Sequence, residues 1–84
     1  MELQGIISKW HLNNDDVHTI YRATRAIEGD INRMSARRYW VADILNRRGI
    51  AFNAFVLEND TPAISNAIDY QVWTDRGVVD RRTA

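Results

Sequence analysis

The stretch from Ser35 to Gly49, SARRYWVADILNRRG, decides how the middle of this chain folds. Its apolar residues Val41, Ile44 and Leu45 recur at intervals of three and four, which is the period of one face of an α-helix. Serine is a residue type that caps the first turn of a helix, and glycine favours the left-handed conformation that closes the last turn. The sequence therefore predicts a helix that begins at Ser35 and ends at Gly49.

A second helical pattern lies upstream of this stretch. Apolar side chains recur at the same period from Val17 to Met34. Asn13 and Asn14 precede the pattern and can cap its first turn. Gly29 interrupts the pattern, and we expect the helix to end or kink near this residue because glycine is a poor helix former.

Two shorter segments flank the central pair. Apolar spacing over residues 2–12 predicts a short helix. A stripe from Ile64 to Val72 predicts a final helix that has Pro62 in its first turn and ends at Gly77. Residues 50–57, IAFNAFVL, fit either a short strand or two helical turns, because eight positions do not separate the two periods.

These patterns predict a mostly all-α fold, a small three- to four-helix bundle, with one short strand or extended segment at 50–57 as the open alternative. The single helical domain covers residues 1–77, and residues 78–84 form a partly ordered C-terminal tail. The predicted core consists of Ile20, Ile27, Val41, Ile44, Leu45, Ile64 and Ile68.

The composition argues against several classes of function. The 84 residues include no cysteine, so neither a disulfide nor a thiolate zinc site can stabilise the fold. The four glycines are isolated, so no glycine-rich phosphate loop is present. No nucleophile motif or metal-ligand spacing stands out, and we expect no catalytic, cofactor or metal site and no enzymatic activity. Because no apolar run is long enough to span a membrane and no secretory signal is evident, we expect a cytoplasmic protein without a membrane partner.

Charge is distributed unevenly along a chain whose net charge is zero. Arginines dominate residues 22–48, whereas residues 58–75 carry acids and no base. One interpretation is that the two zones pair with each other inside a monomer or across a dimer. The other is that arginines lie at the surface and contact a partner.

The second interpretation names a candidate interface. Tryptophan, tyrosine and arginine are the residue types enriched at binding hot spots. The predicted partner-binding residues are Arg37, Arg38, Tyr39, Arg47, Arg48, Trp73 and Arg76. The expected function is that of a small interaction or regulatory protein that binds and modulates a protein partner, as a monomer or a homodimer. Small chains without a cofactor include phage and mobile-element accessory proteins that inhibit a host complex, and this chain fits that class.

The alternative function is DNA binding by a helix-turn-helix-like regulator. In that arrangement residues 29–35 form the turn, and the helix from Arg37 to Arg48 presents its N-terminal arginines to the DNA. A DNA-binding domain normally carries a clear basic excess, and this chain has none. The sequence therefore favours a protein partner over nucleic acid.

Overall fold

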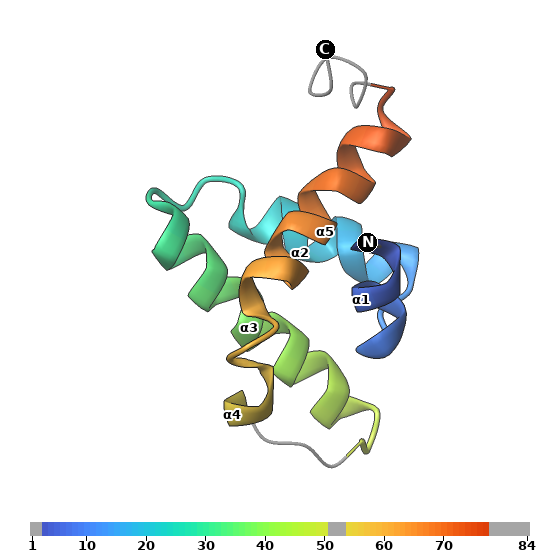
Figure 1. Ribbon diagram of the computed structural model, residues 1–84, viewed down its shortest axis with the longest axis vertical. Helices are drawn as coiled ribbons and strands as arrows, with labels where there is room; N and C mark the ends of the chain where they lie inside the picture. Colours follow the sequence, from blue (N-terminus) through green and yellow to red (C-terminus); the bar gives the residue numbers. More distant parts are fainter. Residues whose placement is uncertain (1–2, 51–53, 78–84) are drawn as a thin grey trace.

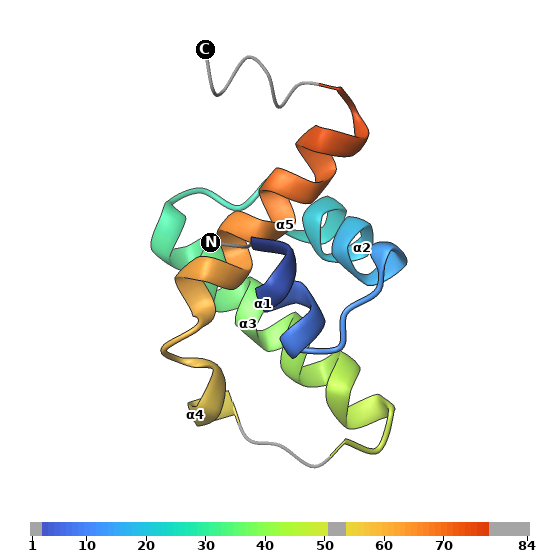
Figure 2. The ribbon, with the colours of Figure 1, turned by 45° about the vertical axis from the view of Figure 1, so that its right-hand side comes forward.

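The computed structural model describes residues 3–50 and 54–77, which form five α-helices and no strand. They are α1 (Leu3–Lys9), α2 (Asn14–Thr24), α3 (Asp30–Arg47), α4 (Ala54–Leu57) and α5 (Thr61–Asp75). Helix α5 contacts α1, α2 and α3 and lies at the centre of the bundle (Figure 1). The short α4 packs against α3, away from α2 (Figure 2). The prediction of a small all-α bundle is confirmed.

The structure decides between strand and helix for part of the segment 50–57. Its last four residues form α4, so this portion is helical. Residues 51–53 lie outside the described part of the chain, as does the predicted C-terminal tail at 78–84.

The start of α2 follows the sequence prediction. The side-chain Oδ1 of Asn13 accepts a hydrogen bond from the Asp16 backbone N–H at 2.8 Å, and the Asn13 backbone N–H donates to Asp16 Oδ2 at 3.0 Å. This reciprocal capping box satisfies two backbone donors at the helix start. Asn13 is therefore the N-cap.

The boundary between α2 and α3 differs from the prediction. Helix α2 ends at Thr24 and α3 begins at Asp30, so the helix break occurs just before the position expected. Gly29 has a φ of +84°, a conformation that glycine adopts at low cost, and its carbonyl accepts the hydrogen bond from the Arg33 backbone N–H. Ser35 consequently lies inside α3 and is exposed. The prediction that Ser35 caps this helix is wrong, because the left-handed Gly29 starts the helix more than one turn earlier.

The C-terminal end of α3 forms as its sequence indicates. Gly49 has a φ of +76°, and its backbone N–H donates to the Asn46 carbonyl at 3.1 Å. The Ile50 backbone N–H donates to the Leu45 carbonyl at 3.0 Å, and Ile50 packs against the core. These two hydrogen bonds and the apolar contact define a Schellman motif.

The core consists of apolar side chains from α2, α3 and α5, together with Trp10 and Leu12 after α1 and Leu57 at the end of α4. Six of the seven predicted core residues are buried, and Ile27 is half-buried because it lies in the loop between α2 and α3. Trp10 also enters the core, and its indole N–H donates to Asp60 Oδ2 at 2.9 Å. The Lys9 ammonium donates to the same oxygen at 2.8 Å, so α1 is tied to the start of α5.

Candidate functional site

Arg37 is an interior residue, with 1 % of its surface exposed. Its Nε–H donates to Thr24 Oγ1 at 2.9 Å, and one terminal nitrogen donates to both the carbonyl and the hydroxyl oxygen of Ser65 at 3.1 and 2.9 Å. The other terminal nitrogen forms an ion pair with Asp69 at 2.9 Å. The guanidinium therefore joins α2, α3 and α5. Arg37 does not belong to an exposed arginine face. This corrects the prediction that placed it among the partner-binding residues.

The spacing of Arg37 explains its position. It precedes Val41 by four residues and Leu45 by eight, which places all three on the same face of α3. On α5, Ser65 and Asp69 are four residues apart and face Arg37 together. Sequence analysis missed Thr24 and Ser65 as partners of Arg37, whereas Asp69 belongs to the acids that one interpretation paired with these arginines. The available signal was that Arg37 shares a helical face with the apolar Val41 and Leu45, which indicates a buried position.

Arg48 and Arg47 are engaged in contacts within the chain. Arg48 donates to the His11 carbonyl at 2.8 Å and to Asp16 Oδ2 at 2.6 Å, so it fastens the end of α3 to the corner between α1 and α2. Arg47 forms an ion pair with Asp43 one turn earlier on α3, and both side chains are exposed. Exposed pairs of this kind contribute little to stability.

Acids within residues 58–75 also have partners within the chain. Asp60 binds Lys9 and Trp10, Asp69 binds Arg37, and Asp75 Oδ2 lies 2.6 Å from His18 Nε2. The hydrogen bond from Lys9 lowers the pKa of Asp60 most, followed by that from Trp10. The hydrogen bond with His18 is the largest cause of the lowered pKa of Asp75. Internal pairing of the acidic zone is thus shown at these three positions.

The remaining predicted residues lie at two places. Tyr39 is 78 % exposed and borders a small groove of about 380 Å³, whose described lining comes from α3 and includes Asp43 and Arg47. Trp73 is half-buried on α5, and the Arg76 guanidinium lies 5.3 Å from the centre of the Tyr21 ring. Arg38, the neighbour of Tyr39, is half-buried. The predicted residues therefore do not form one continuous face.

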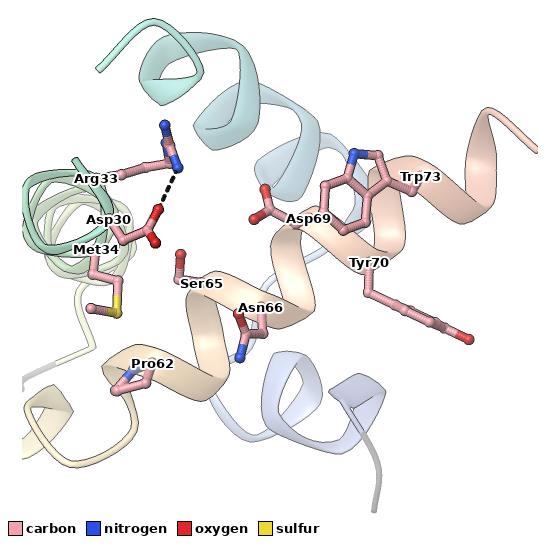
Figure 3. A pocket seen from close by; sticks show the side chains of 9 residues that line it. All are labelled: Asp30, Arg33, Met34, Pro62, Ser65, Asn66, Asp69, Tyr70 and Trp73. Carbon is pink, nitrogen blue, oxygen red and sulfur yellow. Dashed lines mark hydrogen bonds and ion pairs between the residues drawn. The ribbon is translucent and has the colours of Figure 1, made fainter. Parts of the chain in front are cut away.

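A larger groove of about 610 Å³ lies between the start of α3 and the outer side of α5. Figure 3 shows the side chains of α3 facing those of α5 across it. Its described lining consists of Asp30, Arg33, Met34, Pro62, Ser65, Asn66, Asp69, Tyr70 and Trp73. We call this site the α3–α5 groove. Trp73 is the one predicted partner-binding residue that it contains.

Apolar side chains line the α3–α5 groove. Tyr70 on α5 is 40 % exposed, and Met34 and Trp73 are half-buried. Ile31, one turn before Met34 on α3, is 75 % exposed but does not belong to the described lining of the groove. Exposed apolar residues that gather around a concave surface are typical of a binding site, whereas single exposed ones are not informative.

The buried polar atoms need no ligand to complete their hydrogen bonding. Within the described residues, every buried side-chain nitrogen and oxygen has a hydrogen-bond partner. Across the same residues, no group of three or more histidines and acids is arranged to hold a metal ion. None of the helices in the described ranges is long and apolar enough to span a membrane.

Comparison with known protein families, curated proteins and solved structures finds no match to this chain.

Proposed function

We propose that this chain is a non-enzymatic interaction protein that binds a protein partner through the α3–α5 groove. The observation that carries this proposal is that Met34, Tyr70 and Trp73 line a groove between two helices. Helices that present an apolar groove commonly receive an extended or helical segment of a partner. A chain of this size acts on its partner by covering part of its surface, which is a regulatory role.

The α3–α5 groove is a better candidate than the smaller groove beside Tyr39. Its walls come from two helices that pack on each other, whereas the described lining of the smaller groove comes from α3 alone. Two packed helices hold their side chains in fixed relative positions, which lowers the entropy lost on binding.

DNA binding is less well supported by the position of the arginines. The proposed recognition helix would present Arg37 and Arg38 near its N-terminus, but Arg37 is enclosed by Thr24, Ser65 and Asp69. The first turn of α3 instead carries the acidic side chain of Asp30. An acid at this place repels the phosphate backbone.

The test compares matched tyrosine variants on the two grooves. Immobilised protein carrying Tyr70→Ser, and protein carrying Tyr39→Ser, are each compared with the unmodified chain for proteins retained from the cells that produce it. We expect one specific protein to be retained by the unmodified chain and by Tyr39→Ser, and to be lost from Tyr70→Ser. Far-UV circular dichroism checks that both variants remain folded.

Two outcomes contradict the proposal. Retention by Tyr70→Ser and loss by Tyr39→Ser would assign the contact to the smaller groove. Binding to duplex DNA that weakens steeply with salt and depends on Arg38 would favour the DNA-binding alternative, because phosphate contacts release counterions.

A further inference from the structure

We infer that the α3–α5 groove receives an arginine side chain of the protein partner, with Asp69 as the acceptor and Trp73 as the surface on which the guanidinium stacks. This inference rests on the proposed function and specifies the chemistry of the bound segment. It follows from the hydrogen-bonding groups that line the groove and from their fixed positions.

Asp69 offers an acceptor that is already held in place. One of its carboxylate oxygens, Oδ1, pairs with the buried guanidinium of Arg37 at 2.9 Å. The ion pair is made through Oδ1, and a carboxylate has about four acceptor positions, so Asp69 can accept from a second donor. Figure 3 shows the Asp69 side chain directed into the groove, between Ser65 and Trp73. A carboxylate fixed in this way loses little conformational entropy when a second donor binds.

Trp73 follows Asp69 by one helical turn, so the two side chains lie on the same face of α5. A guanidinium is planar, stacks on aromatic rings and donates two parallel hydrogen bonds to a carboxylate. A carboxylate beside an indole ring therefore fits arginine better than lysine, whose ammonium is a compact and strongly hydrated charge.

The opposite wall adds a second carboxylate. Asp30 on α3 is 92 % exposed, and one of its oxygens pairs with Arg33 at 3.1 Å. Arg33 also donates to the Ile27 carbonyl at 2.8 Å. The Arg33 guanidinium, which lines the groove, is therefore bound to α3 and to the loop before it. The groove thus presents carboxylate oxygens from both walls to an incoming donor, and Met34 and Tyr70 provide apolar surface for the residues that flank it.

The experiment titrates labelled protein with the capped tripeptide Leu-Arg-Leu and follows the amide and indole N–H signals by NMR. The matched probe is Leu-citrulline-Leu, in which a neutral urea replaces the guanidinium. We expect saturable shifts at Asn66, Tyr70 and the Trp73 indole. We expect the citrulline peptide to bind about fivefold more weakly or worse, because hydrogen bonds between charged groups are stronger than neutral ones.

Two protein variants test the assignment to the groove. Asp30→Asn removes one of the two carboxylates, and Asp43→Asn removes an acid of the Asp43–Arg47 pair elsewhere on α3. Asp30→Asn should weaken arginine-peptide binding, and Asp43→Asn should leave it unchanged. Trp73→Leu should also weaken binding while the spectrum shows that the fold is intact. Asp69 is not varied because it partners the buried Arg37.

Equal binding of the two peptides would overturn the inference. Chemical-shift changes that lie outside the groove and are the same in Asp30→Asn would also overturn it. Concentration-dependent dimerisation that is lost in Asp30→Asn would assign the groove to a second copy of this chain and would also overturn it. If groove variants lose the cellular partner while arginine and citrulline peptides bind equally, the proposed function stands and the arginine assignment fails.

Discussion

Replacement of Arg37 by alanine is expected to destabilise the fold more than alanine replacement of Arg38, Arg47 or Arg48. The guanidinium forms hydrogen bonds with Thr24 and Ser65 and an ion pair with Asp69. Removing one member of a buried ion pair typically costs about 3–5 kcal/mol, because the remaining charge loses its partner. We expect the lower end of this range, about 3 kcal/mol, since Asp69 retains some contact with solvent and Thr24 keeps its hydrogen bond to Ile20.

Urea denaturation followed by tryptophan fluorescence and far-UV circular dichroism measures this loss. With a slope of about 1 kcal/mol per molar urea for a small domain, the midpoint should fall by about 3 M, or the variant should be unfolded in buffer. Arg38→Ala is the matched control, because Arg38 is adjacent and half-buried; its change should stay within about 0.5 kcal/mol. Equal midpoints for Arg37→Ala and Arg38→Ala would refute the assignment of Arg37 to the interior.

Three further predictions follow from the local geometry. Asn13→Ala should cost about 1 kcal/mol because it removes the cap of α2, whereas Ser35→Ala should change stability by no more than about 0.5 kcal/mol; urea denaturation measures both. Leu45→Ala should cost about 2–5 kcal/mol in the same assay, because this buried side chain leaves a cavity. The pKa of Asp75 lies below its ordinary value of 3.8, so its contribution to stability is present above that pH and is lost as the pH falls through the lowered pKa. In His18→Ala the NMR titration of the Asp75 carboxyl should move up toward 3.8, and an unchanged titration would contradict the role of His18.

Helix ends determined by contacts close in sequence were predictable. Asn13 caps α2 through Asp16, and Gly49 ends α3 through Asn46 and Leu45. Each of these motifs is complete within about six residues, so residue type and spacing are sufficient. The start of α3 was mispredicted because serine and glycine both suit a helix start, and the turn at Gly29 preceded the serine.

The role of Arg37 was not predictable from residue type alone. Arginine is usually exposed, and its partner residues Ser65 and Asp69 are about thirty residues away in the chain. Their proximity depends on how α5 crosses α3, which no local pattern determines. The α3–α5 groove was missed for the same reason, since its two walls are brought together by the packing of helices distant in sequence.

The Nε–H proton of Arg37 provides the most direct test of whether this face of α3 is interior. An NMR spectrum of the arginine side chains should show this proton protected from exchange with water and close to the side chain of Thr24, whereas the Arg38 Nε–H should exchange rapidly. Rapid exchange at both arginines would contradict the arrangement of α2, α3 and α5 around Arg37 and, with it, the fixed position of Asp69 in the α3–α5 groove.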